Sequence, residues 1–199
     1  ITNSLFVRND GGGNGQELLV DDSSSAGTLQ NCSFVGIGSG RGIAPASVTL
    51  INSIVMSYYT GVSTSPGVST TASFNDFFGN TVNASGFVLD PTANLFVDPL
   101  LDIDFHLSAG SALIDAGTRT GGPFHDLDGE PRPMAAGSGR FAMDIGADEF
   151  SGEAQRVVDL DREPPDSTIV GPGNPPENPA SSGTNDWIGY AVMGDDVNG

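Results

Sequence analysis

Two aspartates in the segment "DLDG" have the spacing best suited to binding a metal ion. Asp126 and Asp128 are two residues apart and precede Gly129, so a turn at the glycine would let both carboxylates converge on one hard cation. Ca²⁺ prefers such oxygen ligands, but the full twelve-residue calcium loop is absent. An Asp-Gly turn with solvated carboxylates explains the same residues. We therefore expect no required cofactor, and we expect any metal to be calcium held by oxygen atoms rather than by histidine.

The sequence contains no recognisable catalytic set. His106 and His125 each stand apart from a Ser or Cys nucleophile in a recognisable setting, so surface or satisfied core positions are expected for both. The pattern assigns no catalytic residue and no cofactor-binding residue.

A polysaccharide lyase or glycoside hydrolase remains the alternative. A lyase needs a basic residue near a calcium-bound uronate, and a hydrolase needs two facing carboxylates. The chain has no lysine, and the only basic residues before position 94 are Arg8 and Arg41. Asp21, Asp22 and Asp76 are the acidic residues that could accompany them.

The charge of the chain limits its partners. There are 25 acidic and seven basic residues, which give a formal net charge of −18. Such a protein repels nucleic acid and anionic membranes, and no apolar run approaches the length that spans a bilayer. We expect neither nucleic-acid binding nor membrane insertion. The acidity fits an extracellular or cell-surface protein, although charge for solubility alone also explains it.

A local pattern recurs in "ITNSLFV", "TLQNCSFVG", "VTLINSIVM" and "TTASFNDFF". Asn3, Asn31, Asn52 and Asn75 mark equivalent places in it, at spacings of 28, 21 and 23 residues, which suit one coil of a solenoid. Glycine-rich breaks separate the segments, and no helical period is present. The pattern predicts an all-β fold, a right-handed parallel β-helix over residues 1–93. An antiparallel sandwich with chance asparagine spacing stays open.

In such a stack, like residues lie above one another, with the large apolar side chains inward and asparagine at a bend. The residues expected to fill much of the interior are Leu29, Cys32, Phe34, Leu50, Ile54, Phe74 and Phe77.

Residues 94–150 contain "NLFVDPLLDIDFHLSAGSALIDAG", "DLDGEPRP" and "DIGADEF". This combination resembles the closing module of many secreted bacterial right-handed parallel β-helix proteins, of the choice-of-anchor or pectate-lyase-like kind. The resemblance implies a cap, in which the strands "FVDP", "FHLS" and "ALIDAG" finish the stack and the acidic loops lie on its outside. A cap protects the open backbone edge of a final coil.

Residues 151–199 begin with a Pro/Gly-rich linker and end with one apolar segment. They resemble the opening of Ig-like modules in bacterial surface proteins, but they stop short of a complete sandwich. The tail could pair with another copy and build a homo-oligomer or filament. We therefore expect a non-catalytic structural or adhesive module of a secreted or cell-surface repeat protein, with polysaccharide as a further possible partner.

Overall fold

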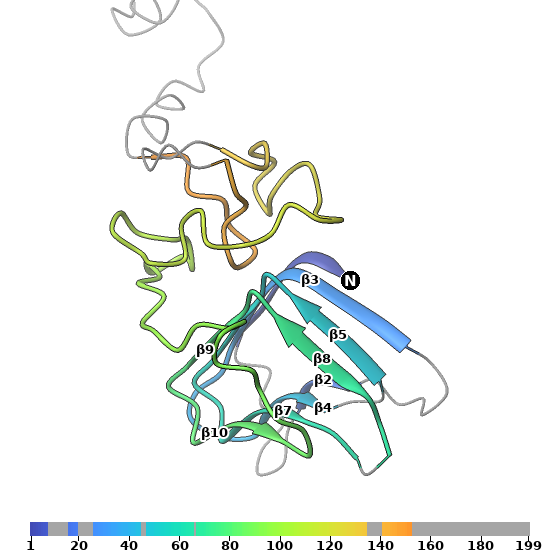
Figure 1. Ribbon diagram of the computed structural model, residues 1–199. Coiled ribbons are helices and arrows are strands. Elements are labelled where there is room, and N and C mark those ends of the chain that lie inside the picture. The colour runs from blue at the N-terminus through green and yellow to red at the C-terminus, as the bar shows by residue number, and fades with distance from the viewer. Residues whose placement is uncertain (8–15, 20–25, 45–46, 66, 135–140, 153–199) are drawn as a thin grey trace, which may run out of the picture. The chain divides into compact units, whose positions relative to one another are not determined.

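The computed structural model describes residues 1–7, 16–19, 26–44, 47–65, 67–134 and 141–152 (Figure 1). These residues belong to one unit, Ile1–Gly152. The described residues form strands and turns without helices, so they include no helix long and apolar enough to cross a membrane.

The strands form two sheets in which all neighbours are parallel. The first sheet contains β1 (Thr2–Val7), β3 (Ala26–Val35), β5 (Ser47–Ile51), β6 (Ile54–Met56), β8 (Thr70–Ser73) and β9 (Asp76–Phe78). The second contains β2 (Gln16–Leu19), β4 (Arg41–Ala44), β7 (Thr60–Ser63) and β10 (Val82–Ser85).

The chain passes from the first sheet to the second and back, so each passage, here called a repeat, adds a parallel strand to both. Phe6, Phe34, Val55 and Phe77 lie in register across four successive repeats. The expected all-β class and the parallel pairing are confirmed. The curled parallel sheets are consistent with a β-solenoid (Figure 1).

The first core consists of inward side chains of both sheets. Of the expected interior residues, Leu29, Cys32, Phe34, Leu50 and Phe77 are buried in this core. Glycine-rich breaks and β-branched or aromatic strand residues suit such alternating, half-buried strands. The rings of Phe6 and Phe34 stack with their centroids 4.6 Å apart, as the parallel register requires.

Two of the expected interior residues differ in position. Ile54 is fully buried, but it packs in a second core with Leu107, Leu113 and Ile145. Phe74 is 44% exposed, so its assignment to the interior is wrong. The reason is its backbone: Phe74 has φ of 57° and occupies a bend between β8 and β9 rather than an inward strand position.

The asparagine pattern describes this bend, with one error of register. Asn3, Asn31 and Asn52 have φ of 47°, 50° and 48°, in the left-handed region that asparagine tolerates well. The pairings Ile51 with Ser73 and Ile54 with Asp76 make Phe74 the equivalent of Asn52. Asn75 was expected there but lies one position later. The last repeat therefore advances by 22 residues instead of 23.

Asn75 instead belongs to a buried polar column that joins successive repeats. The Cys32 N–H donates to Ser53 Oγ at 3.2 Å, and the Ser53 N–H donates to Asn75 Oδ1 at 2.9 Å. The Asn75 N–H in turn donates to Asn94 Oδ1 at 3.2 Å. Each bend thus satisfies a backbone group that would be costly to bury alone.

The bend position of Phe74 makes a stabilising substitution predictable. We expect Phe74→Asn to raise the free energy of unfolding by about 1 kcal/mol, because a bulky residue is strained at positive φ whereas asparagine adopts this conformation readily. Urea denaturation measures the change. Thr71→Asn, on the exposed face of β8, is the control and should not stabilise. A less stable Phe74→Asn protein would contradict the assignment of strain to this bend.

The described residues of the segment 94–150, namely 94–134 and 141–150, consist mainly of turns and isolated bridges. The strands expected at 96–99, 105–108 and 112–117 are absent: the second contributes only the bridge of Leu107 with Leu101, and the third lies in turns. The physical reason is that backbone N–H groups of these stretches bond to side chains or to carbonyls of nearby turns: the Leu107 N–H donates to Asp148 Oδ2 at 2.7 Å, and the Ile114 N–H donates to the Ser111 carbonyl at 3.4 Å.

The segment begins by extending the stack and then contacts its bends. Leu95 forms a parallel bridge with Asp76. Further along, Asn52 accepts the Thr118 N–H at 2.8 Å and donates to the Thr118 carbonyl at 2.7 Å. Gly146, with φ of 120°, lets the loop approach closely, because a Cβ there would lie 2.7 Å from Ile54 Cδ1. The segment is therefore fixed along the side of the repeats as well as beyond them.

Candidate functional site

Five side chains of residues 94–150 form a cluster with the residue types of a metal site. Its members, here called the acidic cluster, are His106, Asp126, Asp128, Glu130 and Asp148. Their potential ligand atoms fall into two groups, one of His106, Asp128 and Asp148 and one of Asp126, Glu130 and Asp148. Within each group the atoms lie within 4.8 Å of one another, so Asp148 connects the two.

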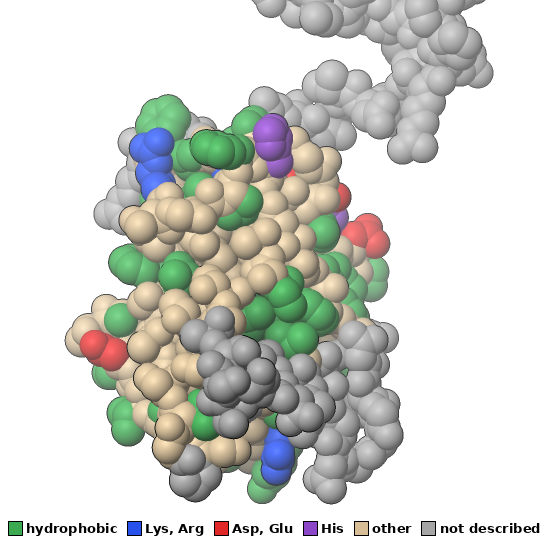
Figure 2. Space-filling view, turned by 90° about the vertical axis from the view of Figure 1, so that its right-hand side faces the viewer, with side chains coloured by type: hydrophobic (Ala, Val, Ile, Leu, Met, Phe, Trp, Pro, Cys, Tyr) green, Lys and Arg blue, Asp and Glu red, His purple; other side chains and the backbone are tan. Residues whose placement is uncertain are grey.

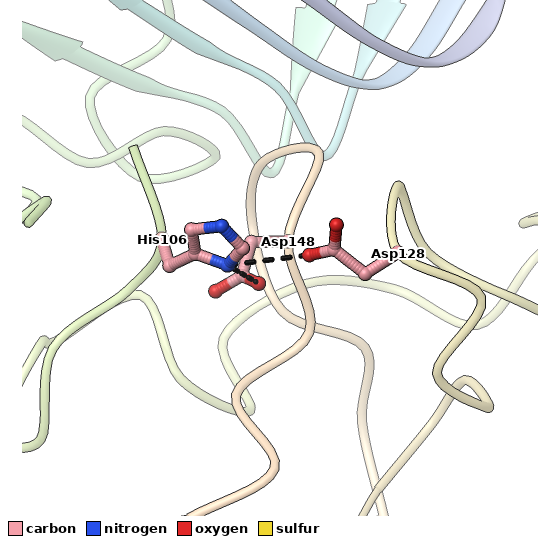
Figure 3. Close-up of side chains that lie close together, drawn as sticks. All are labelled: His106, Asp128 and Asp148. Carbon is pink, nitrogen blue, oxygen red and sulfur yellow. Dashed lines mark hydrogen bonds and ion pairs between the residues drawn. The ribbon is translucent and has the colours of Figure 1, made fainter. Parts of the chain in front are cut away.

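The first group is centred on one imidazole nitrogen. His106 Nδ1 lies 3.1 Å from Asp148 Oδ1 and 3.2 Å from Asp128 Oδ2. The two carboxylates approach this nitrogen from different loops (Figure 3). The Asp128 side chain is 46% exposed, whereas that of Asp148 is 5% exposed, so the group has one buried and one open side.

Backbone contacts hold the buried side of this group in place. Asp102 Oδ1 accepts the His106 N–H at 3.0 Å, and the Asp102 N–H donates to the His106 carbonyl at 2.9 Å. Asp148 Oδ2 accepts the Leu107 N–H at 2.7 Å, which directs Oδ1 toward the imidazole. The positions of His106 and Asp148 are thus fixed by the loops themselves.

Asp126 organises the "DLDG" turn. Its Oδ1 accepts the N–H groups of Asp128 at 2.9 Å and Glu130 at 2.8 Å, and its Oδ2 accepts the N–H of Glu149 at 3.0 Å. The side chain is buried. Asp126 and Asp128 therefore lie in neighbouring groups, and their binding of calcium stays a prediction.

Burial raises the energy of negative charge in the cluster. It raises the pKa of the Asp148 carboxyl, while the Leu107 N–H and His106 act in the opposite direction. Burial also raises the pKa of Glu130, with a further contribution from the Asp126 charge. A cation beside these carboxylates would be favourable, because it would offset both the desolvation and the mutual repulsion.

A second set of charged groups lies in a buried network that shares the same loops. Arg132 Nη1 donates to Glu149 Oε2 at 3.0 Å, and both side chains are 0% exposed. Arg132 Nη2 donates to the Gly146 carbonyl at 3.1 Å. Glu149 also accepts the N–H groups of Asp144 at 3.0 Å and Met134 at 2.8 Å. The network therefore joins the turn at Arg132 to the loop that contains Gly146 and Glu149.

Asp144 completes this network. Its Oδ1 accepts the Asp115 N–H and its Oδ2 the Phe150 N–H, both at 2.6 Å. Burial, together with the charge of Glu149, raises the pKa of Asp144 to about 8. The carboxyl therefore takes up a proton near neutral pH.

The motifs "DLDGEPRP" and "DIGADEF" were expected to form acidic loops on the outside, and this is wrong for most of their acidic residues: the Asp128 side chain is 46% exposed and Glu130 is partly exposed, but the others are buried. The acidic residues buried in the described part of the chain are Asp76, Asp115, Asp126, Asp144, Asp148 and Glu149. The carboxylates of Asp76, Asp126, Asp144, Asp148 and Glu149 accept backbone N–H groups, which offsets the cost of burying them.

Sequence reasoning found Asp126 and Asp128 but missed His106, Glu130 and Asp148. His106 was expected to be a surface or core residue, and it is partly buried against carboxylates. It is 42 residues from Asp148 in the chain, so no local spacing joins them. The only signal in the sequence is that both residues lie in the segment 94–150, which also contains the "DLDG" motif.

Arg41 and Asp76, two of the residues considered for a lyase, do not share one surface. Arg41 is exposed at the start of β4, whereas Asp76 is 0% exposed in β9. Arg8, Asp21 and Asp22 lie outside the described residues. The described part of the chain therefore offers no pairing of Arg41 with Asp76.

The stability of the protein should depend on pH, because Asp76 is buried. Burial, opposed by the Val97 N–H on Oδ1, raises its pKa from 3.8 to about 6. The folded state then binds more protons than the unfolded state between these values, so the contribution of Asp76 to stability is present below about pH 4 and lost as the pH rises through 6.

We expect Asp76→Asn to stabilise the protein by about 1 to 2 kcal/mol at pH 8, since an amide can still accept the Val97 N–H without carrying charge. The effect should vanish at pH 4. Thermal melts of both proteins at the two pH values measure it, with the exposed Asp104→Asn as control. Equal stabilisation at both pH values would show that charge burial is not the cause.

Comparison with family models, curated proteins and solved structures finds no match to this chain.

Proposed function

We propose that the chain is a non-catalytic structural or adhesive module of a secreted or cell-surface repeat protein, built as a right-handed parallel β-helix. One observation carries the proposal: the polar side chains at the bends are bonded within the protein. Asn52 pairs with Thr118, and Asn75 links Leu50 and Asn94. Side chains used in this way position loops and sheets instead of a substrate.

The outer face of the first sheet supports a role in contact with other molecules. Thr28, Thr49 and Thr71 lie in register on β3, β5 and β8, and the hydroxyls of Thr71 and Thr49 are 3.3 Å apart. On the face drawn in Figure 2, charged side chains of the described residues are scattered, and uncharged polar side chains and backbone dominate. Such a surface can adhere to polysaccharide through hydroxyl groups without a charged pocket.

Residues 153–199 lie outside the described residues. We propose that this tail, with its apolar segment and its resemblance to an Ig-like module, joins copies into a homo-oligomer or filament. The open backbone edges of parallel sheets are suitable acceptors for an added strand.

The function is tested with the full chain, uronate polymers and added calcium. We expect no unsaturated product by absorbance, and retention of the protein on insoluble polysaccharide. Release of unsaturated product that is lost in Arg41→Ala would overturn the non-catalytic proposal in favour of a lyase.

Light scattering on the same preparations tests assembly. The full chain should form larger particles than a chain without residues 153–199. The same number of chains per particle in both proteins would contradict the filament. The adhesive role would then be tested by the retention assay alone.

A further inference from the structure

We propose that His106, Asp128 and Asp148 form a binding site for a first-row divalent metal ion such as Zn²⁺. The proposal does not depend on the adhesive or structural role, since it concerns the loops of residues 94–150 alone.

His106 cannot satisfy both of the carboxylates that face its Nδ1 by hydrogen bonding alone. A ring nitrogen has at most one hydrogen to donate, yet Nδ1 faces two carboxylate oxygens at 3.1 Å and 3.2 Å. One N–H directed to Asp148 leaves Asp128 without a linear bond, and the reverse also holds. A metal ion bound to all three atoms satisfies both carboxylates and the nitrogen lone pair together.

The distances from His106 Nδ1 to the two carboxylate oxygens are close to those between the ligand atoms of a zinc ion. Zn²⁺ binds imidazole nitrogen and carboxylate oxygen at about 2.0 to 2.2 Å in tetrahedral geometry, which places neighbouring ligand atoms about 3.3 to 3.6 Å apart. The separations of Nδ1 from the oxygens of Asp148 and Asp128 are close to this range. Small movements of the exposed Asp128 side chain would complete the fit (Figure 3).

Hydrogen bonds to neighbouring loops hold His106 and Asp148 in place. Asp148 is buried and held by the Leu107 N–H, and His106 is held through its backbone by Asp102. Asp126 and Glu130 lie beside Asp148 and add negative charge that favours a cation. Preorganised ligands of this kind are what a metal site requires.

The chemistry of the donors selects the metal class. Imidazole nitrogen suits Zn²⁺, Ni²⁺ and Cu²⁺, whereas Ca²⁺ takes oxygen ligands. A His, Asp, Asp site therefore differs from the calcium site expected at Asp126 and Asp128. Three protein ligands also leave a fourth position for water or for a group of another molecule.

The test is a calorimetric titration of the full chain with ZnCl₂ after treatment with a chelator and desalting. We expect saturable binding of one ion per chain. His106→Ala and Asp128→Asn should each weaken it at least about tenfold, and Asp128→Asn serves as the variant least able to disturb folding because its side chain is half exposed. His125→Ala, at the chain's other histidine, is the matched control and should leave the affinity unchanged.

A Co²⁺ titration gives an independent reading, because ligand-field absorption should appear with the wild-type chain and be lost in His106→Ala. The proposal fails if Zn²⁺ binding is not saturable, or if it is the same in His106→Ala as in the wild type. It also fails if Ca²⁺ binds while Zn²⁺ does not, an outcome that would favour the oxygen site at Asp126 and Asp128 instead.

Discussion

Replacing Arg132 with alanine is expected to lower the free energy of unfolding by about 3 to 5 kcal/mol, because removing one partner of a buried ion pair leaves the other charge uncompensated. The Glu149 carboxylate is 0% exposed and would keep only its backbone partners. The carbonyl of Gly146 would also lose the guanidinium donor. Both effects act in the same direction.

Urea denaturation of Arg132→Ala measures this loss, with the exposed Arg41→Ala as a control that should change stability by less than about 0.5 kcal/mol. A double-mutant cycle with Arg132→Met and Glu149→Gln isolates the pair. The double variant should be destabilised by less than the sum of the single variants, since neither buried charge then remains. Additive losses would show that the two side chains contribute independently.

Phe34→Ala is expected to cost about 3 to 5 kcal/mol through lost burial and the cavity that remains. Phe34 is 0% exposed at the centre of the first core and stacks on Phe6. The neighbouring repeats restrict collapse of the cavity, because their backbones are fixed by parallel ladders on both sides of β3.

Thermal or urea unfolding of Phe34→Ala gives the magnitude. Phe124→Ala removes the same side chain at a position that is 81% exposed and should have little effect. If the two substitutions cost the same, Phe34 would not be part of a close-packed core.

The repeat architecture was predictable because it is local. The spacing of Asn3, Asn31 and Asn52 reports a backbone requirement, the left-handed bend, that recurs in every repeat. The same reasoning failed at Phe74 and Asn75, because asparagine suits two neighbouring positions of the repeat for different reasons. One needs positive φ, and the other needs a buried acceptor for a backbone N–H.

The acidic cluster was only partly predictable because its members meet through turns with no periodic pattern. Asp126 and Asp128 were visible as a short motif. The contact of His106 with Asp148 depends on how two loops 42 residues apart pack on each other. Composition alone would place Asp144 and Glu149 on the surface. They are buried because their carboxylates accept backbone N–H groups, which no sequence pattern reports.

The attachment of residues 94–150 to the bends also determines the order in which the chain can fold. Asn3 donates to the His125 carbonyl across 122 residues, and Asn52 pairs with Thr118 across 66. Contacts between residues far apart in the sequence slow folding, because the chain loses the entropy of closing a long loop before the contact stabilises it. During synthesis from the N-terminus, the bends of the first repeats emerge long before their partners do. We therefore expect the contacts between the bends and residues 94–150 to form only after this segment has been made.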